Sequence, residues 1–161
     1  MAKLTHIDDD GQAKMVDVTD KDATLRTATA RGSVLMAAET MALITSGGAK
    51  KGDPLSVARL AGIMGAKKTP ELIPLCHPLA LTSIDVDLTC DPGRNAVDIT
   101  ATCRLTGVTG VEMEALTAVA VAPLPVHDPV NAVARRMRTP AIRLVHTPGC
   151  LPGLFTAHVF T

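Results

Sequence analysis

Two stretches in which apolar and polar residues alternate, joined by a short turn, constrain the fold of this chain more than any other feature. The alternation runs from Ile84 to Leu88, breaks at the turn Asp91–Asn95, and resumes from Val97 to Leu105. Successive side chains of a strand point to opposite faces of its sheet, so this pattern predicts a hairpin with one buried and one solvated face. The chain must therefore build an antiparallel sheet that is covered on one side.

Helical patterns elsewhere in the sequence supply the cover. Asp53-Pro54 is a strong helix start, because aspartate accepts hydrogen bonds from the first turn and proline suits the first helical position. The segment ends at Lys67-Lys68, and four apolar residues recur along it at the spacing of one helix face: Val57, Leu60, Ala61 and Met64.

Weaker patterns complete the predicted order of elements. Helices are expected over residues 37–46, ended by Gly47-Gly48, and from Val111 to about Val121; strands are expected over residues 25–36 and around 142–144. Residues 1–23 are interpreted as an N-terminal arm with a short strand-like piece over residues 15–18, and residues 1–161 as one domain. Helices on one face of an antiparallel sheet make an α+β sandwich.

Composition excludes several classes of partner. Sixteen basic residues balance sixteen acidic ones, so the chain has neither a nucleic-acid-binding tail nor a polybasic membrane anchor. Only 1% of residues are aromatic, which removes the base-stacking platforms of single-stranded nucleic-acid binders and leaves a thin aliphatic core that oligomerisation would extend. No signal peptide, long apolar run or CxxC pair is present, so a cytoplasmic protein with reduced thiols is expected.

Residue spacing alone gives only hints of chemistry. Lys50-Lys51 and Lys67-Lys68 suit either an anionic ligand or ordinary solvated surface, and the spacing favours the second. Cys76-His77 lies in a stiff loop, residues 69–78, that holds three prolines and in which no regular element is expected. This pair fits a proton-transfer histidine, a packed loop or a pair of metal ligands; no second pair has zinc-site spacing, so no metal site is predicted. Glu112 and Glu114 should lie on different faces of a helix.

Two longer strings resemble motifs of a known family. They are Leu72-Ile73-Pro74-Leu75-Cys76-His77-Pro78-Leu79 and Thr109-Gly110-Val111-Glu112-Met113-Glu114-Ala115-Leu116-Thr117-Ala118, and shorter strings from residue 15 onward agree with them. The chain resembles, over essentially its whole length, the molybdenum cofactor biosynthesis protein C family, the cyclic pyranopterin monophosphate synthases. The resemblance implies a ferredoxin-like subunit, assembled as a hexamer of three dimers with sites at subunit interfaces. It also implies a molybdopterin-pathway lyase that converts (8S)-3′,8-cyclo-7,8-dihydroguanosine 5′-triphosphate to cyclic pyranopterin monophosphate and diphosphate.

The resemblance also assigns residues. It implies substrate contacts from Leu75, Cys76 and His77 in the first motif and from Met113 and Glu114 in the second. It places Asp128 in the active site, with Lys51 and His77 as further catalytic residues, the histidine because it exchanges protons near neutral pH. Four cations are expected to clamp the triphosphate: Lys51, Lys67, Arg26 and Arg104. No cofactor is expected, with Mg²⁺ accompanying the triphosphate as the open alternative.

From Pro123 onward the sequence departs from the family's pattern. Asn131, Thr147 and Leu151 stand where the resemblance implies lysines, and three prolines interrupt an expected helix. Each interior proline costs a helix about 3 kcal/mol, so residues 123–132 are predicted to be irregular or kinked, with Asp128 extended before Pro129. Three hypotheses stay open: an active synthase, a non-catalytic relative that binds a nucleotide or pterin, and a structural oligomerisation module. Whether the stretch 123–152 is natural or a misread sequence also stays open.

Overall fold

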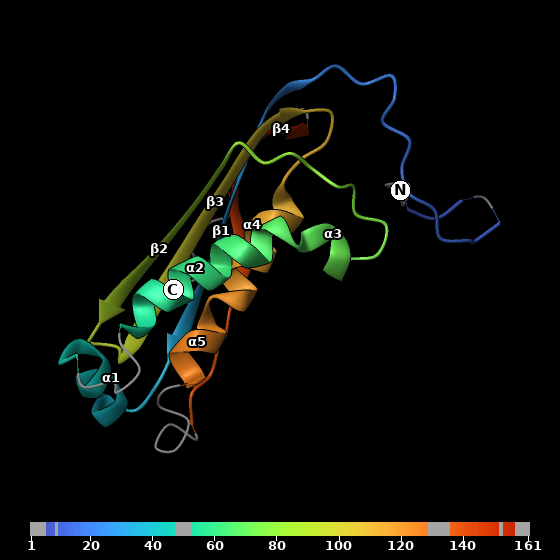
Figure 1. Cartoon of the computed structure of the whole chain (residues 1–161). Helices are drawn as coiled ribbons and strands as arrows, with labels where there is room; N and C mark the ends of the chain where they lie inside the picture. The colour runs from blue at the N-terminus through green and yellow to red at the C-terminus, as the bar shows by residue number, and fades with distance from the viewer. Residues whose placement is uncertain (1–5, 9, 48–52, 129–135, 152, 157–161) are drawn as a thin grey trace.

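The structure is a computed structural model that describes residues 6–8, 10–47, 53–128, 136–151 and 153–156, the segments 147–151 and 153–156 by their backbone alone. Figure 1 shows a sheet with helices laid across one face. The elements in chain order are β1 Thr24–Leu35, α1 Ala38–Thr45, α2 Pro54–Lys67, α3 Thr69–Leu72, β2 Ser83–Asp91, β3 Ala96–Gly107, α4 Glu112–Val121, α5 Pro123–His127, β4 Arg143–Leu151 and β5 Gly153–Thr156.

The sheet is antiparallel, with its strands in the order β2-β3-β1-β4-β5. The predicted hairpin is confirmed as β2 and β3, with Val86 opposite Ala101 and Leu88 opposite Ile99. On β3 the residues of the predicted inner face are all buried: Val97, Ile99, Ala101, Cys103 and Leu105. The expected α+β, ferredoxin-like arrangement is therefore confirmed. The sequence missed β5 and most of the length of β4.

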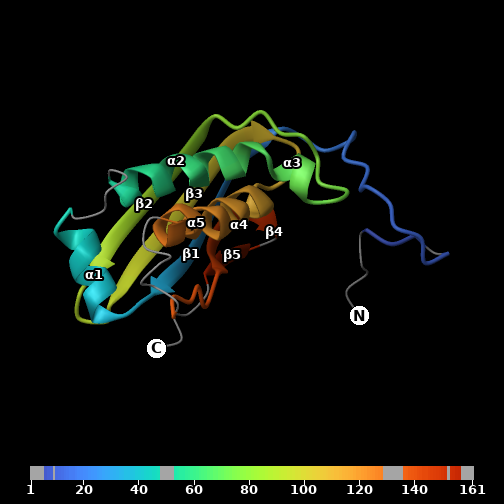
Figure 2. The same ribbon diagram turned by 60° about the horizontal axis from the view of Figure 1, so that its bottom comes forward.

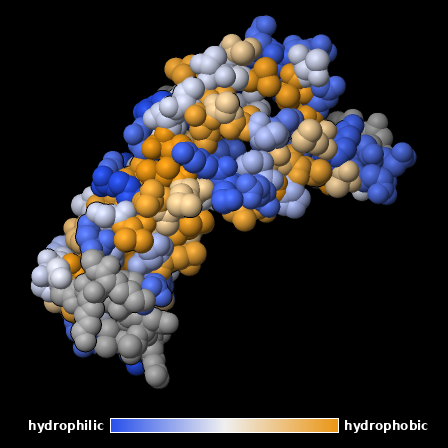
Figure 3. All heavy atoms as spheres, in the orientation of Figure 1, coloured by the Kyte–Doolittle hydropathy of each residue, from blue (hydrophilic) through white to orange (hydrophobic). Residues whose placement is uncertain are grey.

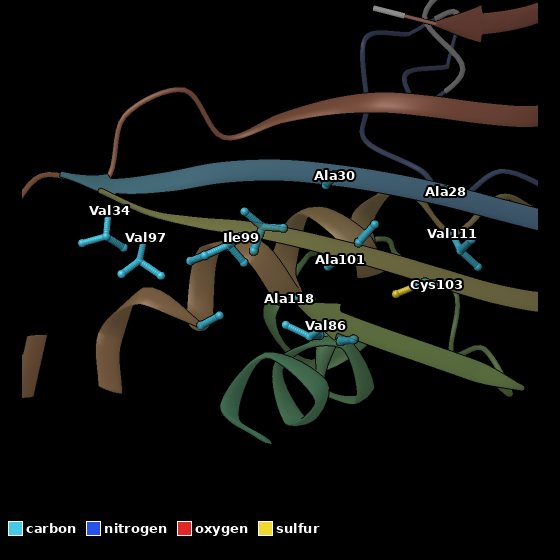
Figure 4. Close-up of a cluster of buried hydrophobic side chains, with 14 of the residues drawn as sticks. Ala28, Ala30, Val34, Val86, Val97, Ile99, Ala101, Cys103, Val111 and Ala118 are labelled. Carbon is cyan, nitrogen blue, oxygen red and sulfur yellow. The ribbon is translucent and has the colours of Figure 1, made fainter. Parts of the chain in front are cut away.

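The core lies between the sheet and the helices and is made of small aliphatic residues. Figure 4 shows side chains of β1, β2 and β3, among them Ala30, Val86 and Ile99, gathered beside Ala118 of α4. Cys103 and Val111 extend the cluster toward one end of the sheet. A core of alanine and valine leaves little thickness between the layers, so the helices can pack close to the strands.

The helix α2 begins and ends where the sequence indicates, but it buries a different face. The side chain of Asp53 accepts hydrogen bonds from the backbone N–H groups of Leu55 and Ser56. The buried residues are small ones: Pro54, Ala58, Gly62, Gly65 and Ala66. Three of the four residues expected to form the packed face are exposed, at 51% for Val57, 58% for Leu60 and 52% for Met64, and the fourth, Ala61, is half-buried.

Glycine explains which face of α2 is buried. A Cβ on Gly62 would lie 3.1 Å from the carbonyl oxygen of Ala118, and one on Gly65 would lie 3.0 Å from the Cβ of Val121. Two helices can approach this closely only where a side chain is missing. Figure 2 shows α2 and α4 side by side above the sheet. Close approach to α4 thus outweighs burial of the larger apolar side chains.

The predicted interruption after residue 122 is confirmed, because α4 ends at Val121 and does not continue unbroken, but the described residues 123–128 are helical rather than irregular, and the predicted extended geometry of Asp128 is wrong. Pro123–His127 form the short helix α5, and Asp128 has φ −58° and ψ −50°, which is helical rather than extended. The physical reason is that a new helix, with Ala122 as its N-cap, begins after α4 ends. Pro123 and Pro125 then occupy the first turn of a new helix, where N–H groups have no intrahelical acceptor to lose. Residues 129–132 of this prediction lie outside the described residues.

The proline-rich loop and the arm also differ in detail from expectation. Thr69–Leu72 form the one-turn helix α3, because Pro70 sits in its first turn, where proline is tolerated. The remainder, from Ile73 to Thr82, has no regular element. The arm is not a strand over residues 15–18; it makes one bridge between Ile7 and Ala13 around a turn held by Asp8. No helix among the described residues is long and apolar enough to cross a membrane.

Candidate functional site

The two motifs singled out in the sequence meet at one cavity of about 520 Å³. It lies where the loop after α3 passes the start of α4, at one end of the helix layer (Figure 1). The lining comes from three parts of the chain: His6, Ile73, Pro74, Leu75, Cys76, His77, Leu79, Thr109, Gly110, Glu112, Met113 and Glu114. Residues separated by more than thirty positions therefore share one site.

Local backbone geometry explains how each motif reaches the cavity. Leu75 has φ 64°, a left-handed conformation that L-residues rarely adopt, and it turns the chain sharply before Cys76. On the other side, β3 ends at Gly107 and Thr109-Gly110 lead into α4 at Glu112. The first turn of α4 thus carries Glu112 and Glu114 at the positive end of the helix dipole, where carboxylates are stabilised.

Glu114 is the most unusual residue of the site, because it is an acidic residue with only 2% of its surface exposed. Burial raises the pKa of Glu114, and the neighbouring charge of Glu112 raises it further. Among the described residues no cation is paired with it. A buried carboxyl without a cation holds its proton to higher pH than an ordinary glutamate does.

The thiol of Cys76 points to this carboxyl group. Its Sγ lies 3.9 Å from Oε1 of Glu114 and donates a weak hydrogen bond to it. Burial raises the pKa of the Cys76 thiol, and the charge of Glu114 adds to the effect. The thiolate is the nucleophilic form of cysteine, so these surroundings suppress nucleophilic chemistry at Cys76. Cys76 and Glu114 form a hydrogen-bonding pair rather than an activated nucleophile.

His77 is oriented by the N-terminal arm. Its Nε2 lies 2.9 Å from the backbone carbonyl oxygen of Val16. A carbonyl can only accept, so Nε2 carries the proton and donates it to this bond. The other ring nitrogen, Nδ1, is then left with its lone pair, and the neutral imidazole can accept a proton there. A backbone contact 61 residues away in sequence thus selects the tautomer of His77.

The structure brings together five of the residues predicted to bind substrate, and His77 among them is also predicted to be catalytic. Leu75, Cys76, His77, Met113 and Glu114 all line the cavity. Sequence analysis did not select the seven other lining residues as site residues: His6, Ile73, Pro74, Leu79, Thr109, Gly110 and Glu112. Six of these belong to the two motifs, which could have indicated them. Nothing local marks His6, because its place depends on how the arm folds back.

The remaining predicted site residues do not line this cavity. The Nε of Arg26 donates a hydrogen bond of 3.2 Å to the carbonyl oxygen of Gly107, two residues before the lining residue Thr109. Lys67 is an exposed residue in the last turn of α2. Arg104 pairs with Asp85 at 2.9 Å, and both residues alternate with the buried positions of β3 and β2, so they lie on the sheet face away from the helices.

Two predicted catalytic residues remain. Asp128 is exposed at the end of α5, and Figure 1 shows α5 at the opposite end of the helix layer from the cavity. Lys51 lies outside the described residues. A complete constellation of Asp128, Lys51 and His77 is therefore not found within the described part of one chain.

The donor set around Cys76-His77 does not resemble a metal site. The Cys76 thiol is directed to Glu114 and the His77 ring to Val16, so the two side chains diverge. In the part of the chain that the structure describes, no group of three histidine, cysteine, aspartate or glutamate side chains is placed to hold a metal ion.

Comparison with known proteins places the chain in a family. Residues 15–150 match the sequence model of the MoaC family. The cyclic pyranopterin monophosphate synthase of Rhodospirillum rubrum is 60% identical over 154 residues, covering 96% of this chain and 93% of that protein. The protein of the same name from Pelotomaculum thermopropionicum is 58% identical, covering 96% of this chain and 91% of that protein. The one from Cereibacter sphaeroides is 55% identical, covering 98% of this chain and 99% of that protein. The family match and the near-complete coverage confirm what the two motifs indicate: the chain belongs to the MoaC family.

Proposed function

We propose that this protein is a cyclic pyranopterin monophosphate synthase, a lyase of molybdenum cofactor biosynthesis. It converts (8S)-3′,8-cyclo-7,8-dihydroguanosine 5′-triphosphate to cyclic pyranopterin monophosphate and diphosphate. One observation carries the proposal: two motifs far apart in sequence line a single cavity that holds a buried carboxyl group and an oriented histidine. The relatives described above, at 55–60% identity, are named for this activity.

The cavity offers the proton transfers that such a rearrangement needs. Opening one ring and closing another moves several protons, and positioned acids and bases each contribute about 10²–10⁴-fold in rate. Glu114 keeps its proton to higher pH than an ordinary glutamate and serves as an acid. His77 accepts a proton at Nδ1, because Nε2 is committed to Val16. Cys76 remains a thiol and acts as a hydrogen-bond donor.

The triphosphate requires cations that this cavity does not itself supply. Glu112 and Glu114 give its lining two carboxyl groups, and no lysine or arginine is among the lining residues described. In this proposal Arg26, Lys67 and Lys51 neutralise the phosphates, while Asp128 and Arg104 are contributed by a neighbouring copy of the chain. Charge neutralisation and positioning then provide most of the rate of the cyclic phosphate closure, an intramolecular displacement.

Assembly into a hexamer of three dimers, with sites between subunits, is part of the same proposal. It is supported by the exposed apolar stripe on α2, formed by Val57, Leu60 and Met64. Figure 3 shows hydrophobic residues gathering over the helix layer on the face turned to the viewer. A second copy of this chain would bury that stripe. It could also bring its own Asp128 to the cavity.

For metals, we propose that the protein contributes no resident ion and that any Mg²⁺ enters bound to the substrate phosphates, as is usual for this ion. Turnover should then respond to the Mg²⁺ in the buffer, and the purified protein should contain no stoichiometric metal by elemental analysis. A metal that co-purifies at one per chain would contradict this part.

The non-catalytic alternative is less well supported. Its motivation is Asn131, Thr147 and Leu151, where the family resemblance implies lysines. However, the match to proteins named as synthases spans 96–98% of the chain at 55–60% identity and so includes this stretch. Since Asp128 keeps helical geometry, the structural argument against activity loses its basis.

The direct experiment incubates the purified full-length protein with the cyclised dihydroguanosine triphosphate and measures the pterin product and diphosphate. We expect turnover, with Glu114→Gln lowering kcat by about 10²–10⁴-fold because a proton donor is lost. Arg59→Gln, an exposed change on α2 away from the cavity lining, is the matched control and should keep wild-type kcat. Substrate binding without product, in both the wild type and an Asn131→Lys variant, would establish the non-catalytic alternative.

A further inference from the structure

A second cavity, of about 870 Å³, lies at a distance from the first in the fold and shares none of its lining residues. Besides Thr89 of β2, its polar lining comes from β1, β3, β4 and the β2–β3 turn: Arg31, Ser33, Arg94, Asp98, Thr100 and Arg143. These positions alternate along β1 and β3 with the buried residues that face the helices. The cavity therefore opens on the sheet face opposite the helix layer, which Figures 1 and 2 show lying on one side only.

Two of its arginines stand next to each other on neighbouring strands. Arg31 of β1 and Arg143 of β4 are directly opposed Cα partners in the antiparallel pairing. Side chains at opposed positions point to the same face, about 4.5–5.5 Å apart at Cβ. Like charges at such positions repel and destabilise the pair. An anion bound between the two guanidinium groups would remove this repulsion.

Asp98, the acidic residue of this lining, already has partners of its own. Asp98 accepts a hydrogen bond from the Ser33 hydroxyl at 2.7 Å and is paired with Arg94, which also pairs with Asp91 at 2.6 Å. Within the described part of the chain, neither Arg31 nor Arg143 is ion-paired with a carboxylate. Two positive charges thus remain uncompensated in a polar depression.

One nitrogen of this pair lacks any partner although it is shielded from solvent. The Nε of Arg143 is buried and has no hydrogen-bond acceptor, while its Nη1 makes only a long contact, 3.4 Å, with the carbonyl oxygen of Ala141. A buried N–H of a guanidinium group without an acceptor is costly. The hydroxyl of Thr100, opposite Arg31 on β3, adds a neutral donor beside the two charges.

We propose that Arg31 and Arg143 form a binding site for a phosphate or diphosphate group on the open face of the sheet, separate from the catalytic cavity. Phosphate oxygens accept the paired N–H groups of guanidinium in bidentate geometry, which makes arginine the preferred side chain for them. The bound group satisfies the Arg143 Nε and relieves the repulsion between the two arginines. The site does not depend on the catalytic assignment, because it shares no residue with that cavity.

The experiment titrates the full-length protein with sodium phosphate and sodium diphosphate and follows thermal unfolding with an external dye, since the chain has neither Trp nor Tyr. Sodium chloride at matched ionic strength controls for screening. Phosphate should raise Tm above the chloride value. Arg31→Gln, at an exposed position, should weaken the binding of phosphate about tenfold, which is the effect of losing about 1.4 kcal/mol of charged hydrogen bonding. Arg59→Gln removes the same charge from α2 and should leave the phosphate response unchanged.

A charge-reversal variant provides an independent test of the site. Arg31→Glu places a carboxylate opposite Arg143, so it should raise Tm without phosphate and abolish the phosphate response. Equal phosphate responses in wild type, Arg31→Gln and Arg59→Gln would overturn the site and assign binding to the catalytic cavity or elsewhere. A response that chloride reproduces would also overturn it. If Arg31→Gln instead changes the oligomeric mass and not the phosphate response, these arginines meet carboxylates of a second copy and the proposal is wrong.

Discussion

Asp53 and Glu114 are both carboxylates near the start of a helix, yet their surroundings shift their pKa values in opposite directions. Asp53 caps α2 from an exposed position, and hydrogen bonds from Ser56 and Leu55 lower its pKa. Glu114 lies inside the first turn of α4, where burial raises its pKa. Hydrogen bonding to the charged form favours ionisation, whereas loss of water disfavours it. The two residues therefore make opposite contributions to the dependence of stability on pH.

Glu114→Gln should stabilise the protein at alkaline pH. Between the ordinary glutamate pKa and the raised folded-state pKa the native state binds the extra proton, so wild-type stability falls as pH rises through this window. Glutamine has no such slope. Urea unfolding at fixed protein concentration, followed by circular dichroism, should show little difference between the proteins near pH 4 and a more stable variant at pH 8. A difference that does not grow with pH would mean that the Glu114 carboxyl group is ionised at little cost.

Asp53→Ala should destabilise the protein by about 1 kcal/mol at pH 7, the usual value of an N-cap. The folded-state pKa of Asp53 is lowered, so its contribution is present above the unfolded pKa and is lost as pH falls through the folded one. The cost of the substitution should shrink accordingly below pH 4. Asp53→Asn keeps the capping oxygen without the titration and serves as the control. Equal stability of the alanine variant and the wild type at pH 7 would contradict this role.

At the scale of elements, the contact between α2 and α4 depends on two glycines. The structure leaves a Cβ at Gly62 only 3.1 Å from a carbonyl oxygen and 3.3 Å from side-chain carbons of Ala122 and Val86. These neighbours belong to a helix backbone and a packed core, so they cannot move aside cheaply. Alanine would improve helix propensity at this position but would press α2 away from α4.

Gly62→Val should therefore destabilise the protein by about 1–3 kcal/mol, the range observed for overpacked cores. Arg59→Val introduces the same branched side chain at an exposed position of the same helix and controls for the loss of helix propensity. Chemical denaturation of both variants at one protein concentration separates the two effects. If both variants lose the same stability, the close approach of α2 and α4 is not what Gly62 provides.

Features that depend on residues within one element were predicted well, whereas features that depend on contacts between elements were not. Alternation gave β2 and β3, and the Asp53-Pro54 signal gave the start of α2, because both depend on neighbouring residues. Which face of α2 is buried depends on how closely α4 can approach, and no periodicity within α2 reports that. The helix α4 ends at Val121, just before the prolines, as the sequence predicts, but the sequence did not reveal that a new helix, α5, begins at Pro123, whose first turn tolerates both Pro123 and Pro125. His6 reaches the cavity only through the path of the arm.

At the scale of the whole molecule, the described chain leaves two kinds of surface uncovered. One is the apolar stripe of Val57, Leu60 and Met64 on the helix layer. The other is the polar face of the sheet that carries Arg31 and Arg143. Apolar surface favours a protein partner and charged surface favours water or small anions, so the helix layer is the side on which a second copy is expected to bind.

Leu60→Glu should dissociate the proposed assembly while leaving the subunit folded. Leu60 is 58% exposed in the single chain, so glutamate there meets water rather than the core. In an assembly each copy would lose the burial of a leucine, about 1.5–3 kcal/mol, and would bury a charge instead, weakening association by at least tenfold. Sedimentation should show a smaller particle with unchanged circular dichroism. Turnover should fall as well, because a site completed by a second chain is lost with it.

Leu25→Glu is the matched control for this test. Leu25 lies on β1 and is 67% exposed. Its position alternates with those of the buried residues Ala28 and Ala30, so it lies on the sheet face away from the helices. The same charge introduced there should leave the wild-type mass intact. If Leu25→Glu dissociates the particle and Leu60→Glu does not, the subunits meet across the sheet, and Asp128 must reach the cavity by another route. If the wild type is an oligomer and neither variant changes its mass, the α2 stripe does not hold the assembly together. A wild-type monomer that turns over substrate would show that one chain completes the site.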